Sequence, residues 1–211
     1  MNTPYFGNDL PTNTNKTPEN YAFIDGQNIE TGLKIQALEI LYQELFDYLT
    51  TKYKVKKVYY CSKYSNYSLR LQFFENLKKI GYGMIFSSGV GNGRDDGSHK
   101  VNVDADLIVK CLTDYFLVEK FGLVLLSGDG DFVPLIRFFE EQKQFVKIIS
   151  PSKIATSKML SFDRFTTKRR FLTYLCEELP KLTKKISPPK ESGGIDETSS
   201  TVPFPVKQII K

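Results

Sequence analysis

Short apolar runs alternate with segments of helical periodicity through the middle of the chain. The apolar runs predict five strands, at residues 21–25, 55–61, 82–87, 123–126 and 145–149. Apolar spacing of three and four residues predicts helices at 29–49, 67–80, 103–119 and 132–141, and Gly81 is placed to close the second of them. This alternation predicts a three-layer α/β/α sandwich around a central, mainly parallel sheet of about five strands.

The remaining segments divide the chain into one domain and two ends. A short helix is predicted at 154–160 and a longer, basic one at about 168–185. Residues 1–19 are rich in Asn, Thr and Pro, and residues 187–211 begin SPPKESGGIDETSS, so both are predicted to be flexible tails around a domain at 20–186. The apolar end VPFPVKQII leaves two alternatives open, docking on a protein partner or on the domain itself, and a homodimer is left open as well.

The predicted topology brings two aspartates together. Sites in open parallel sheets form beyond the carboxyl ends of the strands, where the strand order reverses. Asp25 ends the first strand and Asp129 follows the fourth. If the strands lie in the order 3-2-1-4-5, these two carboxylates meet at one edge of the sheet.

Composition excludes several classes of protein. No apolar run approaches the roughly 18 residues of a membrane span, and the N-terminus lacks the pattern of a secretory signal, so a cytoplasmic protein without membrane contact is expected. The chain has one histidine and three cysteines. Because the cysteines are widely separated, they favour buried thiols over zinc or redox sites. Clustered carboxylates in such a chain most economically predict a divalent metal site.

The positive charge is concentrated near the C-terminus. The whole chain has a formal net charge of +5. The segment 150–190 alone holds ten Lys or Arg against three acids. These cations are interleaved with aromatic residues, a pattern that suits a polyanion, and Lys168, Arg169 and Arg170 are the candidate RNA contacts. The alternative is a solvated helix face.

Two polar residues follow the first strand. Asp25 stands directly beyond a buried strand, where an unpaired carboxylate is costly, so it is a candidate metal ligand and catalytic residue. The alternative for Asp25 is a turn or capping role. Asn28 precedes the predicted helix, where Asn is a preferred N-cap, and it is also a candidate contact for substrate or for metal-bound water.

Helical geometry separates the next two acids. Asp104 shares a face with Leu107, Ile108 and Cys111, the side predicted to meet the sheet, and is the better ligand. Asp106 points elsewhere and stands four residues before Lys110, a spacing that predicts a weak ion pair on an exposed face. The alternative is that the tilt of the helix brings Asp106 to the site.

The segment SGDGD (127–131) supplies the last residues of the predicted site. Asp129 and Asp131 flank Gly130 at a strand-to-helix turn, and both are candidate ligands, with Ser127 beside them as a candidate substrate contact. The glycines at 128 and 130 permit a tight backbone and leave room for a bulky ligand. The alternative for Asp131 is an N-cap of the helix that begins at Phe132.

Three or four carboxylates suit a hard cation. Mg²⁺ and Mn²⁺ prefer oxygen ligands, and they activate water and neutralise charge on a phosphate, which is the chemistry of phosphodiester hydrolysis. The polar loop 87–100, SSGVGNGRDDGSHK, leads into the helix of Asp104 and is predicted to be functional. It would bring Arg94, His99 and Lys100 near a bound backbone, with Lys100 the best candidate phosphate contact. Its alternative is a solvated loop.

Three segments resemble a known family. FIDGQN (23–28), KVNVDADLIV (100–109) and SGDGDFVPLI (127–136), with weaker agreement at SKMLSFDRF (157–165), are similar to the NYN domain of the PIN-like nuclease superfamily, specifically its LabA-like group, once labelled DUF88. The resemblance implies a PIN-like sandwich and, in several members, metal-dependent ribonuclease activity. Matched residue by residue, it implies site roles for Asp25, Asn28, Asp104, Asp129 and Asp131. One departure is Lys110, where members often carry an acid. Helical geometry predicts that it lies on the outer face, where the loss of the acid is harmless; the alternative is weakened metal binding.

Three functions are compared. The leading prediction is a metal-dependent endoribonuclease that acts on RNA, expected to be single-stranded, with Mg²⁺ or Mn²⁺ as cofactor. The second is a nucleic-acid-binding or regulatory adaptor that turns over little. The third is a haloacid-dehalogenase-like phosphatase, since GDGD is similar to that group's acids; Gln27 stands where that class needs a second Asp, so this function ranks lowest.

Overall fold

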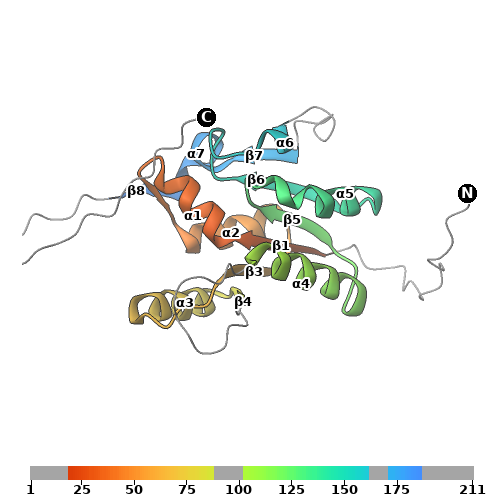
Figure 1. The fold of residues 1–211 in the computed structure, drawn as a ribbon, viewed down its shortest axis with the longest axis horizontal. Coiled ribbons are helices and arrows are strands. Elements are labelled where there is room, and N and C mark those ends of the chain that lie inside the picture. The colour runs from red at the N-terminus through yellow and green to blue at the C-terminus, as the bar shows by residue number, and fades with distance from the viewer. Residues whose placement is uncertain (1–18, 88–101, 162–170, 187–211) are drawn as a thin grey trace, which may run out of the picture.

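A six-stranded parallel sheet forms the centre of the molecule. The structure, a computed structural model, describes residues 19–87, 102–161 and 171–186. The sheet strands are β1 (Asn20–Asp25), β3 (Val55–Lys63), β4 (Gly83–Ser87), β5 (Gly122–Leu126), β6 (Phe145–Ser150) and β7 (Leu172–Tyr174). They lie in the order β4-β3-β1-β5-β6-β7, which Figure 1 shows from bottom to top. The predicted order of the first five strands is confirmed, and β7 extends the sheet by one.

The strand order reverses at β1, which fixes where a site can form. β1 pairs with β3 on one side, with Asp25 opposite Cys61, and with β5 on the other, with Ile24 opposite Leu126. All three strands therefore end at the same edge, and the segments that leave β1 and β5 start side by side.

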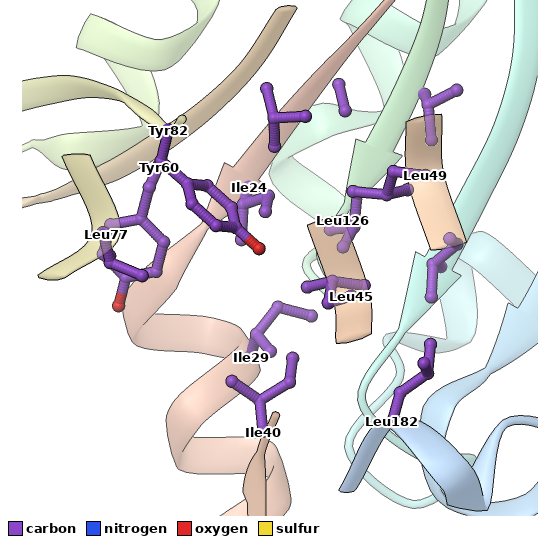
Figure 2. Packing of buried hydrophobic residues seen from close by; sticks show 14 of the residues in the cluster. Ile24, Ile29, Ile40, Leu45, Leu49, Tyr60, Leu77, Tyr82, Leu126 and Leu182 are labelled. Carbon is purple, nitrogen blue, oxygen red and sulfur yellow. The ribbon is translucent and has the colours of Figure 1, made fainter. Parts of the chain in front are cut away.

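Three helices cover one face of the sheet. α1 (Gly26–Lys34), α2 (Tyr42–Lys52) and α3 (Ser68–Ile80) pack their apolar sides on the alternate β1 residues Ala22 and Ile24. Figure 2 shows this cluster, in which Ile29, Leu45 and Leu77 come from the three helices. Gly81 ends α3 with a φ of 122°, as its predicted role requires.

Two further helices cover the opposite face. α4 (Val103–Leu117) and α5 (Val133–Glu141) pack on Tyr21 and Phe23, the β1 side chains that point the other way. A turn of 3₁₀ helix, η1 (Gly130–Phe132), leads from β5 into α5. The α/β/α sandwich predicted from the apolar pattern is thereby confirmed.

The helix predicted at 29–49 is wrong, because two helices and a strand occupy that segment. α1 ends at Lys34, Ala37 takes a φ of 53°, and β2 (Leu38–Ile40) follows before α2 begins. Of the apolar positions 38, 41, 45 and 49 that suggested one long helix, Leu45 and Leu49 lie inside a helix, α2, and are buried there. Leu38 and Ile40 belong to β2, which pairs antiparallel with β8 (Thr183–Lys185).

The basic helix predicted at about 168–185 is also wrong over its described part. Residues 172–185 form β7, then α7 (Leu175–Glu178), the 3₁₀ turn η3 (Pro180–Leu182) and β8. Pro180 cannot continue a helix, and β7 gains a hydrogen-bonded partner in β6. The helix predicted at 154–160 is reduced to α6 (Lys158–Ser161). The predicted tails, apart from Glu19, lie outside the described residues.

Within the described ranges, the helices are too short or too polar to cross a membrane.

Candidate metal and phosphodiester site

Asp25 is the last residue of β1, and its side chain caps the start of α1. Its Oδ1 accepts a hydrogen bond from the backbone N–H of Asn28 at 3.1 Å, so Asp25 is the N-cap and the helix begins at Gly26. The prediction that Asn28 caps this helix is wrong. The capping alternative for Asp25 holds, and it coexists with a position in the candidate site.

Asn28 instead links two segments of the site. Its Oδ1 accepts a hydrogen bond of 2.8 Å from the backbone N–H of Gly128, the second residue after β5. The first turn of α1 is thereby held against the loop that carries the last two aspartates.

Ser127 connects two of the aspartates. It has 0% exposed surface, its Oγ donates to Oδ2 of Asp25 at 3.2 Å, and the same oxygen accepts from the N–H of Asp129 at 3.1 Å. The hydroxyl is thus engaged on both sides within the protein.

Asp129 shapes the turn after β5. Its Oδ1 accepts from the N–H of Asp131 at 2.9 Å, which makes Asp129 the N-cap of η1. Asp131 does not cap α5, whose N-cap position is Phe132, without a side-chain cap. The alternative role considered for Asp131 is therefore wrong, and its exposed carboxylate is left at the site.

Three carboxylates converge. One oxygen each from Asp104, Asp129 and Asp131 lies within 4.8 Å of the other two. Asn102 caps α4 by accepting from the N–H of Ala105, which places Asp104 on the first turn at this edge of the sheet. Leu107 and Cys111, on the same face of α4, are buried against the sheet as predicted.

Asp25 lies beside this trio rather than within it. An open hollow of about 560 Å³ is lined by Asp25, Asp104 and Asp129, together with Asn28 and the exposed α1 residues Gln27 and Thr31. Sequence reasoning did not select Gln27 or Thr31. Gln27 directly follows FIDG, and Thr31 comes four residues later. This spacing is the signal that could have placed both side chains on one side of α1.

Burial and mutual repulsion disfavour charge at this site. The pKa of Asp25 is raised to about 6, first by burial and then by the nearby charges of Asp104 and Asp129, against hydrogen bonds from Asn28 and Ser127 that lower it. The pKa of Asp104 is raised by burial and by Asp129 and Asp131. A divalent cation would reverse these effects, because an opposite charge favours ionised carboxylates.

The space beside Gly26 and Gly128 is filled by neighbouring segments of the protein and not left open for a ligand. A Cβ at Gly128 would stand 2.4 Å from the backbone oxygen of Ala155 and 2.7 Å from Oγ of Ser150. The room that the sequence predicted for a bulky ligand is filled by the segment after β6. At Gly26, a Cβ would stand 2.3 Å from the ring of Tyr60, so α1 begins in contact with β3.

Lys110 and Asp106 do not pair as predicted. The carboxylate of Asp106 accepts a hydrogen bond from Ser87, at the end of β4. The Nζ of Lys110 lies 2.7 Å from Asp114 and 5.1 Å from the ring centroid of Tyr59. Lys110 therefore lies against the sheet rather than on the outer face, and it is engaged in a pair that is separate from the acidic trio.

Several predicted contacts lie outside the described residues. These are Arg94, His99 and Lys100, in the segment 88–101, and Lys168, Arg169 and Arg170, in the segment 162–170.

The six-stranded parallel sheet flanked by helices, with carboxylates gathered at its switch point, agrees with a PIN-like fold. The NYN domain model matches residues 21–174, most of the 211-residue chain, and the chain belongs to the NYN domain family. Its fold is similar to that of a Vibrio parahaemolyticus protein of unknown function, with a TM-score of 0.58 and 21% identity over 71% of this chain and 91% of that one. No curated protein is significantly similar to the chain.

Three carboxylates fit a hard divalent ion. Mg²⁺ and Mn²⁺ take oxygen ligands and keep several waters, so they do not require the histidine or thiolate donors that the described site lacks. Burial, and then the charges of Asp129 and Asp131, raise the pKa of Asp104, and a bound dication would stabilise the ionised carboxylates in this setting.

Proposed function

We propose that this protein is a metal-dependent endoribonuclease that hydrolyses phosphodiester bonds of single-stranded RNA. The observation that carries the proposal is the approach of Asp104, Asp129 and Asp131 to within 4.8 Å, at the edge of the sheet where β1 and β5 end. These three side chains would hold Mg²⁺ or Mn²⁺. Membership of the NYN family supports a nuclease, and the LabA-like group remains a prediction.

The bound ion would supply an activated water and neutralise charge on the phosphate and on the leaving oxygen. The contacts within the protein hold the ligand carboxylates in place. Asp129 is fixed by its cap to Asp131 and by the backbone bond to Ser127, and Asp104 by the capped first turn of α4. Carboxylates held by structure lose little freedom when they bind a ligand, which favours a well-defined site.

Asp25 is assigned a catalytic position next to the ion ligands. Its two oxygens are oriented by Asn28 on one side and by Ser127 on the other. We assign Ser127 to holding Asp25 and Asp129, because its buried hydroxyl is engaged by both, rather than to the substrate contact first predicted. Asn28 holds the loop at Gly128 in the same way.

Contacts to the phosphate backbone by Arg94, Lys100, Lys168, Arg169 and Arg170 remain predictions. The adaptor alternative keeps the departure at Lys110, which stands where family members often carry an acid and pairs with Asp114. It becomes one of the outcomes of the experiment below.

The experiment compares the cutting of end-labelled RNA and DNA by the purified full chain in Mn²⁺, in Mg²⁺ and in chelator. Wild-type protein is expected to cut RNA only with metal. Asp104→Asn and Asp129→Asn are expected to reduce the rate at least ~100-fold, because each removes a charged ligand while keeping the side-chain shape.

Asp106→Asn is the matched control, because it changes an acid on the same helix outside the trio. It is expected to cut within about threefold of wild type, as a change away from the reacting groups should. RNA binding without metal-dependent cutting by wild type would replace the nuclease with the adaptor. Unchanged cutting by both site variants would remove the proposed ligands.

A further inference from the structure

A second hollow adjoins the acidic site. It measures about 800 Å³ and lies between α1 and the segment 62–70, which comprises the end of β3, the connection 64–67 and the first turn of α3. Gln27 and Thr31 line both this hollow and the one that contains the aspartates. The two hollows therefore adjoin at these two side chains of α1, and we call the second one the α1–α3 hollow.

The α1–α3 hollow differs from the acidic site in charge. Its charged side chains are Lys34, Lys63, Arg70 and Glu30. The guanidinium of Arg70 donates from Nη1 to both carboxylate oxygens of Glu30, at 3.1 and 3.2 Å, so these two charges offset each other. Lys34 and Lys63 are exposed, and neither forms an ion pair with a residue that the structure describes. A net positive hollow thus lies next to a net negative one.

Two exposed aromatic rings line the same hollow. Tyr64 is 54% exposed and Tyr67 is 78% exposed. The rings of Tyr64 and Phe86 pack perpendicular to each other, with centroids 5.6 Å apart and planes at 89°. Tyr67 precedes α3 as its N-cap residue, with an extended backbone. Both rings therefore stand on anchored backbone and offer surface to a ligand.

The underlying wall of the hollow is held in place by hydrogen bonds. The carboxylate of Glu30 accepts from the hydroxyls of Tyr42 and Tyr60 as well as from Arg70. Arg70 also donates to Ser62 at 3.3 Å. This network joins α1, α2, β3 and α3, so the residues that face the ligand project from a connected support rather than from a free loop.

We propose that the α1–α3 hollow binds the single-stranded RNA segment that flanks the phosphate at the acidic site. Tyr64 and Tyr67 stack on unpaired bases, and Lys34 and Lys63 contact backbone phosphates. Exposed aromatic rings combined with cations are the chemistry by which proteins bind single strands with little sequence preference. Bases in a duplex are stacked on one another and cannot take these positions, so the hollow selects single strands.

This inference rests on the proposed nuclease site for the direction of the strand, but its test does not require cutting. The binding of a fluorescent single-stranded RNA of about 12 nucleotides is measured by anisotropy with the full-length Asp129→Asn chain in chelator. Tyr64→Ala with Tyr67→Ala is expected to weaken binding at least about tenfold, because two stacking surfaces are lost. Tyr64→Phe with Tyr67→Phe keeps both rings and is expected to bind as the parent does.

The lysines are tested by salt dependence. Lys34→Ala with Lys63→Ala is expected to lower the slope of log affinity against log salt by about 1.4, the loss of two phosphate contacts to a single strand. Lys78→Ala with Lys79→Ala, on the last turn of α3 and outside the hollow, is the matched control and should leave the slope unchanged. Thermal unfolding of every variant confirms that these exposed substitutions preserve the fold.

The results separate the two proposals. If the tyrosine and lysine variants bind RNA as tightly as the parent and with the same salt slope, the α1–α3 hollow does not bind the RNA strand. This conclusion holds whether or not the wild type cuts RNA. The hollow is also not a single-strand track if a duplex of equal length loses as much affinity in the tyrosine variant as the single strand does. If single-strand binding falls as expected while wild type cuts nothing with metal, the track stands and the nuclease proposal fails.

Discussion

The amide oxygen of Asn28 accepts the backbone N–H of Gly128 at 2.8 Å, across 100 residues of sequence. Together with the pairing of β1 and β5 and the Ser127 hydroxyl, this bond holds the start of α1 against the loop after β5. Asp25 precedes the first segment and Asp129 lies in the second, so the relative position of the two aspartates depends on it.

Asn28→Ala is expected to destabilise the fold and weaken metal binding together. It leaves the N–H of Gly128 without its partner, which costs about 1–3 kcal/mol for a buried donor. Losing a group that orients ligands lowers metal affinity by about 10–100-fold. Urea unfolding and Mn²⁺ titration measure the two effects. Asn76→Ala, on the exposed side of α3, is the control and should leave both quantities unchanged.

Gly26→Ala is expected to destabilise the protein by about 1–3 kcal/mol, because the added Cβ would stand 2.3 Å from the ring of Tyr60. Tyr60 cannot easily move, since its hydroxyl donates to Glu30. Urea unfolding of this variant beside Gln27→Ala, at the exposed next position, tests the close contact. Equal stability of the two variants would show that the ring yields.

In chelator, stability is expected to fall as the pH rises from about 4 to about 6. Burial raises the pKa of Asp25 from 3.8 to about 6, so the native state binds more protons than the unfolded state in this window. The ionised side chain then costs the fold of order 2–3 kcal/mol at neutral pH. Asp25→Asn should remove this contribution and be more stable than wild type at neutral pH.

Urea unfolding at about pH 5 and about pH 7.5 measures the difference between the two proteins. Asp47→Asn, which changes an exposed acid on α2, is the control and should keep the wild-type pH dependence. If Asp25→Asn shows the same pH dependence of stability as wild type, the effect belongs to other titratable groups.

Mn²⁺ is expected to stabilise the wild-type protein, because an ion bound only by the folded state shifts the equilibrium by mass action. The gain is about 2.7 kcal/mol when the free ion is at 100 times its dissociation constant. The three carboxylates are expected to act together, so Asp131→Asn should reduce the gain as Asp104→Asn does. Thermal unfolding with and without Mn²⁺ measures it. Equal gains in wild type and in both variants would place the ion elsewhere.

Lys110→Ala is expected to destabilise the fold without changing metal binding. It removes the partner 2.7 Å from Asp114, whose side chain is only 3% exposed. A buried carboxylate that loses its partner costs several kcal/mol, and solvent at the half-exposed lysine reduces the loss to about 1–2 kcal/mol. Lys110→Ala combined with Asp114→Leu should recover part of it. A loss of Mn²⁺ affinity in Lys110→Ala alone would connect this pair to the site.

The apolar pattern predicts most of the sheet, because buried parallel strands are short apolar runs and the helical patterns between them mark where each run ends. It fails where local preference and tertiary pairing conflict. Leu38 fits a helical stripe with Leu41, Leu45 and Leu49, yet it lies in β2, whose partner β8 comes from the other end of the domain. Residues 172–174 likewise become a strand because β6 offers a free edge. Neither partner can be inferred from spacing within one segment.

The sequence alone determined which acids could meet, since each follows a strand or opens a helix at the same edge of a parallel sheet. Tertiary structure decided what each one does. Asp25 caps α1 and lies beside the trio, Ser127 is enclosed between two aspartates, and Lys110 turns to Asp114. The physical reason is that hydrogen bonds and charge pairs act over a few ångströms between segments that are far apart along the chain. A pattern of residue types gives the direction of a side chain from its own helix or strand, but not the partner that it finds there.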